Sequence, residues 1–306
     1  MALEKTFKGT GVALVTPFHE DGSVDYKGLS NLIRHVVEGG VSYLVVLGTT
    51  AESATLDAVE QERIRRFVVS ENAGRLPLVL GLGGNDTRKL VTALQNQNFS
   101  GYDAILSVTP YYNRPSQEGL YRHYSTLAEH TPLPIILYNV PARTGVNMLP
   151  ETVNRLAQSH CNILGIKEAV GDMQQVKSLL ALVPEHFLVI SGDDASAAET
   201  AYYGGAGVIS VLGQALPGLV NEMMRYALSG ARVESQILLS ELTNAMDLIF
   251  QEGNPAGIKA MLELLGICGK QVRLPLVQAS DALSMHLAEA LGKINKHPQL
   301  RSLNLG

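Results

Sequence analysis

A chain of 306 residues with 46% hydrophobic and 17% charged residues can form a large core, which excludes global disorder. Its formal net charge of −5 comes from acidic and basic residues mixed along the chain, which argues against a nucleic-acid surface, since such surfaces usually need a basic patch. No run approaches the ~18 apolar residues of a membrane-spanning helix, and the first ten residues lack the apolar region of a secretory signal.

Eight short apolar runs, each ended by turn residues, recur along the chain. Their continuous apolar character is typical of parallel strands that are buried on both faces. The runs occupy residues 11–17, 43–50, 76–84, 102–110, 134–141, 162–169, 187–194 and 206–213.

Stretches with a helical period of apolar residues separate these runs. In residues 25–40 five aliphatic side chains share one face, and Gly39 and Gly40 end the predicted helix. Further helices are predicted within residues 55–74, 117–130 and 148–160.

After residue 217 the strand signals stop and four helical stretches follow, with Gly and Pro at the joints. The first stretch could complete a barrel, and the others form an appended helical piece. These stretches span residues 217–230, 235–251, 255–267 and 278–296.

The predicted fold class is α/β, a (β/α)8 TIM barrel with a C-terminal helical extension. Eight strand–helix units in about 230 residues match such a barrel. A doubly wound open sheet would alternate in the same way, but the count of eight favours closure, and residues 81–86 lack the G-x-G-x-x-G spacing of a nucleotide fold. We therefore expect a catalytic barrel over residues 1–230 and a helical region over residues 231–306.

The two cysteines, Cys161 and Cys268, are too few for a disulfide framework and suit a reducing compartment. Together with the missing signal, they predict a cytoplasmic protein.

Active sites of TIM barrels lie at the C-terminal ends of the strands, and one of the predicted strands ends in a lysine. Lys167 follows the apolar residues 163–166, where a buried ammonium is costly unless it is paired or used. Lys167 could be a salt-bridged lysine that caps the strand. Alternatively, it could be a nucleophile, because a partly desolvated lysine keeps some free amine to attack a carbonyl and form a Schiff base. Pyridoxal phosphate could also use a lysine, but no companion phosphate loop is found.

Tyr138 ends another predicted strand and also has two interpretations. It could pack inside the barrel with its hydroxyl bonded to backbone, or it could relay protons to and from an imine-forming lysine. Thr49 and Glu52, in GTTAES, have the S/T-x-x-E spacing of a capping box, which predicts a helix start there. Hydroxyls and free N–H groups at a helix start could also bind a small carboxylate.

Arg143 lies in the Pro- and Gly-bounded loop PARTG, where it could be solvated or could bind a substrate carboxylate. Tyr111 and Tyr112 are adjacent, so only one is expected to face a given pocket, and the other is free to pack or to reach a neighbouring subunit. Asp193 and Asp194 are expected in a turn or an N-cap, and no histidine spacing indicates a metal site.

Five segments in the same order carry a family resemblance. GTTAES, TPYYNRPSQEGLY, YNVPARTG, GIKEA and SGDD are similar to motifs of the dihydrodipicolinate synthase family, which is part of the pyruvate-dependent class I aldolase and N-acetylneuraminate lyase superfamily. GIKEA alone marks only the superfamily, whereas YNVPARTG together with TPYYNRPSQEGLY is more specific. The resemblance extends from about Gly11 to the last strand, and the helical extension also fits.

The resemblance implies condensation of pyruvate with L-aspartate 4-semialdehyde to 4-hydroxy-tetrahydrodipicolinate, in diaminopimelate and lysine biosynthesis. Lys167 would form the Schiff base, which turns C3 of pyruvate into an enamine nucleophile. Tyr138 would relay protons and would be linked through Thr50 to Tyr112, which is inserted from the partner subunit of a tight dimer.

For substrate binding, the resemblance implies that Thr49 and Thr50 hold the pyruvate carboxylate and that Arg143 binds the carboxylate of the semialdehyde. Gly192 and Ile209 would present backbone groups near the lysine. No cofactor and no metal are implied, since pyruvate itself is bound covalently, and the assembly would be a homotetramer made of two tight dimers.

Two departures from the family pattern stand out. Ala51 replaces the usual glycine of GTTAES, from which we expect a small local change and intact activity. Ser53, Ala54, Asn85 and Tyr111 match the allosteric pocket of lysine-sensitive members. However, two histidines and a glutamate of that pocket are replaced, which predicts weak or absent inhibition by lysine, since Lys89 would repel an incoming ammonium. The replacing residues are Ala58, Gln61 and Lys89.

Two alternatives stay open. One is another pyruvate-dependent aldolase or dehydratase, such as an N-acetylneuraminate lyase or a keto-deoxy-sugar aldolase, which would lack the arginine of YNVPARTG. The other is a non-catalytic barrel that binds pyruvate-like ligands, which should have lost one of Lys167, Tyr138, Thr50 or Tyr112. All four residues are present.

Overall fold

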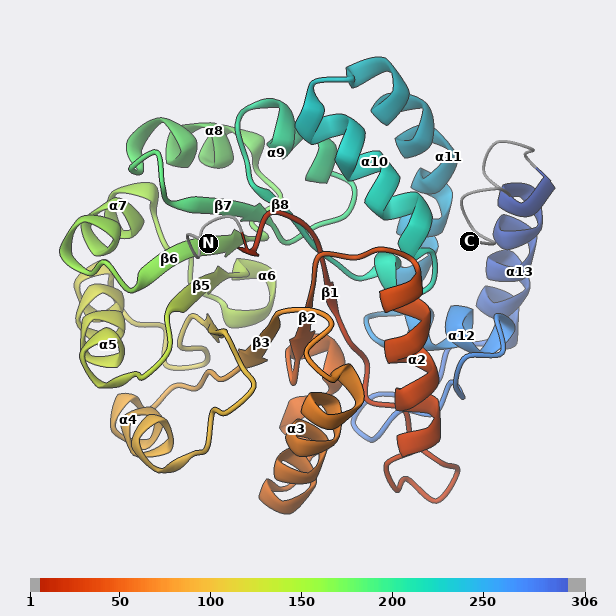
Figure 1. The fold of residues 1–306 in the computed structure, drawn as a ribbon, viewed down its shortest axis with the longest axis horizontal. Helices are drawn as coiled ribbons and strands as arrows, with labels where there is room; N and C mark the ends of the chain where they lie inside the picture. Colours follow the sequence, from red (N-terminus) through yellow and green to blue (C-terminus); the bar gives the residue numbers. More distant parts are fainter. Residues whose placement is uncertain (1–5, 297–306) are drawn as a thin grey trace.

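Eight parallel strands close into a barrel in the order of the sequence (Figure 1), which confirms the predicted fold class. The computed structural model describes residues 6–296, so the first five and last ten residues of the two predicted regions lie outside the described residues. The strands are β1 Gly9–Ala13, β2 Tyr43–Val46, β3 Leu78–Gly81, β4 Ala104–Val108, β5 Ile135–Asn139, β6 Ile163–Glu168, β7 Leu188–Ser191 and β8 Gly207–Ser210.

The barrel closes where β8 pairs with β1, with Gly207 opposite Gly9. Gly207 has a φ of +147°, and a Cβ atom there would lie only 1.9 Å from the carbonyl oxygen of Gly9. Glycine is therefore required at this closure. Seven strands lie within the predicted apolar runs, and β1 starts two residues before its run. The strands are shorter than the runs because the ends of the runs continue into loops.

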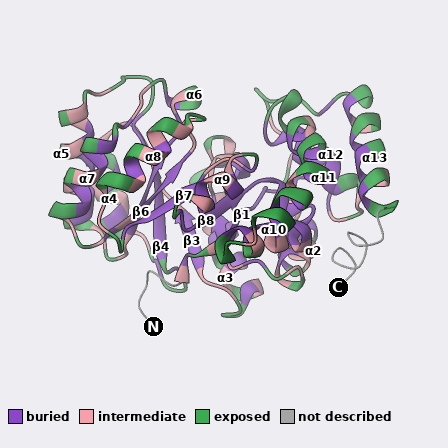
Figure 2. Cartoon of the chain, turned by 90° about the horizontal axis from the view of Figure 1, so that it is seen from above, coloured by how far each residue is buried: buried purple, intermediate pink, exposed green. Residues whose placement is uncertain are grey.

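Helices surround the barrel, with exposed outer faces and buried strands between them (Figure 2). In α2 the carboxylate of Asp25 accepts a hydrogen bond from the Gly28 N–H, and Gly39 and Gly40 end the helix as predicted. The barrel helices are α2 Tyr26–Glu38, α3 Ala58–Asn72, α4 Thr87–Asn96, α5 Gln117–His130, α6 Pro141–Thr144, α7 Pro150–Ser159, α8 Met173–Leu182, α9 Ala197–Tyr202 and α10 Pro217–Ser229. Short 3₁₀ turns are η1 Thr49–Ala51, η2 Ser53–Thr55 and η3 Leu212–Gln214.

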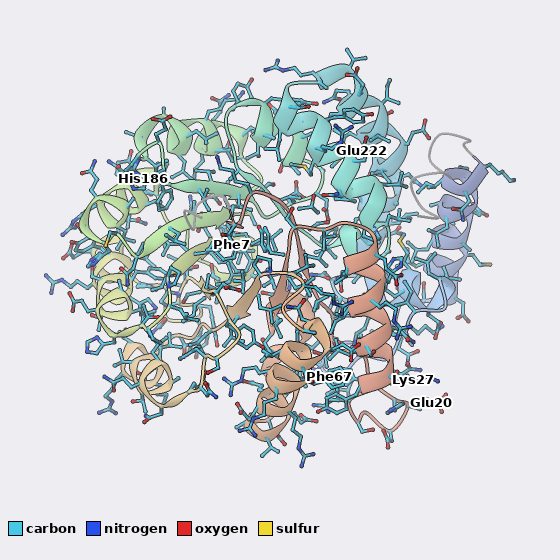
Figure 3. All side chains as sticks on the ribbon, viewed as in Figure 1. Phe7, Glu20, Lys27, Phe67, His186 and Glu222 are labelled. Carbon is cyan, nitrogen blue, oxygen red and sulfur yellow. The ribbon has the colours of Figure 1, made fainter. Side chains whose placement is uncertain are left out.

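The inside of the barrel has its own hydrophobic cluster, separate from the one between strands and helices. Phe7, at the centre of the ring in Figure 3, belongs to this inner cluster, and its ring lies 5.5 Å from that of Tyr43. Phe7 precedes β1 and Tyr43 begins β2, so these rings close the N-terminal end of the barrel. The C-terminal end of the barrel is where polar side chains of an active site are expected.

The predicted helical extension consists of α11 Arg232–Gln251, α12 Ala256–Leu264 and α13 Asp281–Lys296. These helices group on one side of the barrel, where α11 packs against α9 and α10 (Figure 2). The predicted boundary at residues 230 and 231 falls between α10 and α11 and stays a prediction as a domain boundary. Among the helices described, none combines the length and apolarity that a membrane span requires.

Candidate active site

Lys167 and Tyr138 lie side by side on neighbouring strands. Lys167 of β6 is the register partner of Tyr138 of β5, so both side chains face the same side of the sheet. Tyr138 belongs to the inner cluster of the barrel together with Ile136, two residues earlier, and with Ile209 of β8. The shared face is therefore the interior, and the ammonium of Lys167 points into it.

Lys167 is 5% exposed, and its Nζ lies 4.5 Å from the centroid of the Tyr138 ring. Among residues 6–296 it makes no ion pair, so the interpretation as a salt-bridged strand cap is not supported. A cation over an aromatic face is attracted by the ring quadrupole, which offsets part of the desolvation of the ammonium. An unpaired buried amine beside a phenol is the arrangement that imine chemistry needs.

Gly192 has no side chain, which lets the side chain of Lys167 pack closely against it. It follows β7, and its N–H donates a 2.7 Å hydrogen bond to the carbonyl of Glu168. A Cβ atom at Gly192 would lie 3.1 Å from Cε of Lys167 and 2.7 Å from Cβ of Ala169. Any larger residue would therefore crowd the lysine side chain.

A buried polar cluster lies behind this pair, on the outer face of the same strands. Asn139 and Glu168 are also register partners, and Nδ2 of Asn139 donates to both carboxylate oxygens of Glu168, at 2.9 and 3.1 Å. Gln175 donates from Nε2 to the same carboxylate at 3.3 Å. Despite these donors, burial raises the pKa of Glu168 to about 7. No site role was predicted from the sequence for either Asn139 or Glu168.

We expect the pH dependence of stability to report on Glu168. Its pKa rises from 4.5 to about 7 on folding, so the folded state keeps a proton that the unfolded state loses between these values. The contribution of Glu168 to stability is therefore fully present below about pH 4.5 and is lost as the pH rises toward about 7. Relative to Glu168→Gln, the wild type should lose roughly 2 to 3 kcal/mol in the free energy of unfolding between about pH 5 and about pH 8.

Denaturant unfolding of both proteins across this pH range measures the difference. Burial lowers the pKa of His123 to about 4, which gives the opposite slope at acidic pH, but this contribution is common to both proteins and cancels. Parallel stability curves for wild type and Glu168→Gln would contradict the prediction.

Thr49 and Thr50 form a turn after β2 and do not begin a long helix. Thr49 is half-buried, Thr50 is 3% exposed, and η1 ends at Ala51 because Glu52 adopts a left-handed conformation with a φ of +54°. The predicted capping box of Thr49 and Glu52 is therefore wrong. The observed capping box follows η2, where Asp57 and Glu60 cap the start of α3.

Glu52 instead forms a buried ion pair with Lys259 of α12, which the sequence analysis missed. Nζ of Lys259 donates to Oε1 of Glu52 at 2.5 Å, and both side chains are fully buried. Nearby, Nδ2 of Asn254 donates to Oγ1 of Thr50 at 3.0 Å. Hence the helical extension contacts the turn that carries two of the predicted site residues.

Arg143 and Tyr112 do not join Lys167 within the single chain. Arg143 is exposed on the short helix α6. Tyr112 is 91% exposed and has a left-handed φ of +72°, whereas the adjacent Tyr111 is 42% exposed. A positive φ is uncommon for tyrosine, so the loop after β4 holds this ring outward at some conformational cost.

Asp193 acts in a turn, as expected, whereas Asp194 is buried and binds backbone groups 17 and 18 residues away, after β8. Asp193 accepts from the Ser196 N–H at 2.9 Å, and Asp194 accepts from the N–H groups of Val211 and Leu212 at 3.0 and 2.9 Å. Within residues 6–296, no group of three or more His, Cys, Asp and Glu side chains is arranged to hold a metal.

Comparison with known proteins places this chain in a family. The model of the dihydrodipicolinate synthetase family matches residues 6–294. A 4-hydroxy-tetrahydrodipicolinate synthase of Flavobacterium psychrophilum is 52% identical over 283 residues, which cover 92% of this chain and 97% of that protein.

Two solved structures agree with this similarity. The chloride-inhibited dihydrodipicolinate synthase of Acinetobacter baumannii in complex with pyruvate has a TM-score of 0.91 at 38% identity, covering 94% of this chain and 99% of that one. The enzyme of Cyanidioschyzon merolae with lysine bound has a TM-score of 0.90 at 34% identity, covering 94% and 98%. The chain described here belongs to the dihydrodipicolinate synthetase family.

Proposed function

We propose that this chain catalyses the condensation of pyruvate with L-aspartate 4-semialdehyde to 4-hydroxy-tetrahydrodipicolinate, a lyase reaction of lysine and diaminopimelate biosynthesis. The observation that carries the proposal is the amine of Lys167, buried inside the barrel without an ion-pair partner among the described residues and stacked over Tyr138. Membership of the family supports the same reaction.

In the proposed mechanism Nζ of Lys167 attacks C2 of pyruvate, and the carbinolamine loses water to give an imine. Loss of a proton from C3 then forms an enamine, which attacks the aldehyde carbon of the semialdehyde. The amine of the semialdehyde displaces Lys167 by transimination, which closes the ring and frees the enzyme. Because the lysine carries pyruvate covalently, the proposal needs no cofactor and no metal.

The protein supplies positioning and proton transfer. Tyr138, held beside the lysine, is proposed to move protons as the carbinolamine forms and collapses. Thr49 and Thr50 are proposed to hold the carboxylate of pyruvate. Gly192 and Ile209 flank the site, and the missing side chain at Gly192 lets the lysine lie close to the backbone there.

We further propose a homotetramer of two tight dimers in the cytoplasm. The outward ring of Tyr112, with its positive φ, supports insertion into the site of a partner subunit, where it would link to Tyr138 through Thr50. Arg143, exposed in the single chain, is proposed to meet the carboxylate of the semialdehyde at that shared site.

The condensation assay tests the function. Pyruvate and L-aspartate 4-semialdehyde are mixed with the enzyme, and the product is coupled to a reductase that consumes NADPH. Turnover is expected. If borohydride traps a pyruvate adduct but the semialdehyde gives no turnover, the enzyme is another pyruvate-dependent aldolase or dehydratase of the superfamily. A protein that forms no adduct would be a non-catalytic barrel.

We expect weak or absent inhibition by lysine. Nε2 of Gln61 donates to the carbonyls of Ser53 and Leu56, both at 3.1 Å, so both of its protons are already used within the protein. Lys89 is exposed at the start of α4 and adds a positive charge where an attractive glutamate is needed. Activity should therefore stay nearly unchanged in sub-millimolar lysine.

The matched variant Lys89→Glu replaces repulsion by attraction and should increase sensitivity to lysine at low ionic strength. Strong inhibition of the wild type by sub-millimolar lysine would contradict the prediction.

A further inference from the structure

The helical extension holds the Thr49–Ala51 turn through several buried contacts. Besides the ion pair with Glu52, Nζ of Lys259 donates to the carbonyl of Gln271 at 2.7 Å. The backbone N–H of Arg273 donates to Oε2 of Glu52 at 2.9 Å. From the barrel side, Oγ1 of Thr16 donates to the carbonyl of Ala51 at 2.7 Å. The turn is therefore fixed from both sides.

One of these contacts reaches the hydroxyl of Thr50 itself. Asn254 lies between α11 and α12 and is only 9% exposed, and its Nδ2 donates to Oγ1 of Thr50. Its other polar atom, Oδ1, is buried and has no hydrogen-bond partner among residues 6–296. A buried polar group without a partner is destabilising, so the stability of the fold does not explain why an amide is placed here.

The direction of this hydrogen bond determines which further hydrogen bonds the hydroxyl of Thr50 can make. A threonine hydroxyl has one proton to donate and two lone pairs to accept with. Because Nδ2 of Asn254 can only donate, it occupies a lone pair of Oγ1 and leaves the proton of Thr50 free for another acceptor. An ionised carboxylate accepts but never donates, so a threonine that binds one must keep this proton available.

We propose that Asn254 is a positioning residue that keeps the single hydroxyl proton of Thr50 available for donation to the carboxylate of pyruvate. The proposal rests on the proposed function, in which Thr50 contacts the pyruvate carboxylate and links Tyr138 to Tyr112. The helical extension would then take part in the chemistry. Asn254 binds the hydroxyl of Thr50 from outside the barrel, and Lys259 fixes the turn that carries Thr50.

Two substitutions with opposite hydrogen bonding test the proposal. In Asn254→Asp a carboxylate replaces the donor and captures the Thr50 proton, so kcat/KM for pyruvate should fall roughly 10- to 100-fold. In Asn254→Ala the donor is lost but the proton stays free, and a smaller fall of roughly 3- to 10-fold is expected. Both are measured in the condensation assay and by the rate of borohydride-trapped adduct formation with pyruvate alone.

The pH profile separates this role from a structural one. When the introduced aspartate is protonated it can again donate to Thr50, so the activity of Asn254→Asp relative to wild type should rise as the pH falls. Burial raises the pKa of such a carboxyl group, so the recovery should begin near neutral pH. Asn254→Ala should show no recovery. Thermal unfolding of both variants checks that each is folded at the assay temperature.

Equal losses in both variants, with a flat pH ratio for Asn254→Asp, would overturn the inference. Failure of the proposed function is distinguished by the wild type. If the wild type traps pyruvate but does not turn over the semialdehyde, the inference is decided by the trapping rates alone. If it forms no adduct, the function and the inference both fall.

Discussion

Replacement of Lys167 by alanine is expected to lower the rate of condensation at least about 10³-fold and to abolish the covalent pyruvate adduct. Alanine removes the amine that is proposed to form the imine, and within the described residues no other amine lies over the ring of Tyr138. The adduct is measured as a mass increase after borohydride reduction, and the rate is measured in the coupled assay. Lys167→Arg should be equally inactive, since a guanidinium stays protonated and is not a nucleophile.

Lys177→Ala is the matched control. Lys177 lies on α8, where its Nζ is 3.7 Å from the carboxylate of Glu199 and 4.2 Å from the ring centroid of Tyr203. It thus combines a carboxylate and an aromatic ring near a lysine, but on the outside of the barrel. Wild-type turnover and a full pyruvate adduct are expected for this variant. An adduct that persists in Lys167→Ala would place the nucleophile elsewhere.

The barrel could be predicted from the sequence because each strand is a local signal. A parallel strand covered on both faces needs a continuous apolar run, and a run such as residues 134–141 is recognisable without knowing its neighbours. The predicted ends of the strands were less accurate. β5 stops at Asn139, because Pro141 starts the short helix α6, and the apolar residue Val140 between them extended the predicted run.

The predicted capping box at Thr49 and Glu52 shows where local spacing fails. The spacing is correct for a box, but the side chain of Glu52 is held by Lys259, which lies 207 residues away in the sequence. The same spacing recurs at Asp57 and Glu60, and the box forms there although Glu60 also pairs with Arg273, 213 residues away in the sequence. The difference lies in the backbone, since Glu52 has a left-handed φ of +54° that ends the turn, and a local pattern cannot reveal this conformation.

The polar residues behind the site were missed for a related reason. Lys259 lies among apolar residues of α12, and Glu168 directly follows the predicted nucleophile, so each is a charged residue in an apolar segment. Lys167 carries the same signal, a charged residue at the end of an apolar segment. It indicates that a buried charge exists, but its partners, Glu52 and Asn139, come from distant elements that only the folded barrel brings together.

Breaking the buried ion pair should be among the most destabilising single changes in the protein. In Lys259→Met the carboxylate of Glu52 is left fully buried without its cation, and a loss of about 3 to 5 kcal/mol in the free energy of unfolding is expected. Burial lowers the pKa of Lys259 whereas Glu52 raises it, so the ammonium depends on this carboxylate. Urea denaturation of wild type and variant gives the difference.

A double-mutant cycle identifies the cause. If the loss comes from an uncompensated charge, then Glu52→Gln together with Lys259→Met should recover a large part of the stability, because no buried charge is left behind. Lys270→Met is the matched control: its pair with Glu263, at 3.6 Å, is partly exposed and should contribute less than about 1 kcal/mol. If the double variant is no more stable than Lys259→Met, the loss of stability comes from lost packing of the lysine against Phe18, whose ring centroid lies 4.2 Å from Nζ of Lys259. In the single variant Thr50 should be displaced with the turn, so we expect activity to fall together with stability. In the double variant activity should return only if stability is recovered.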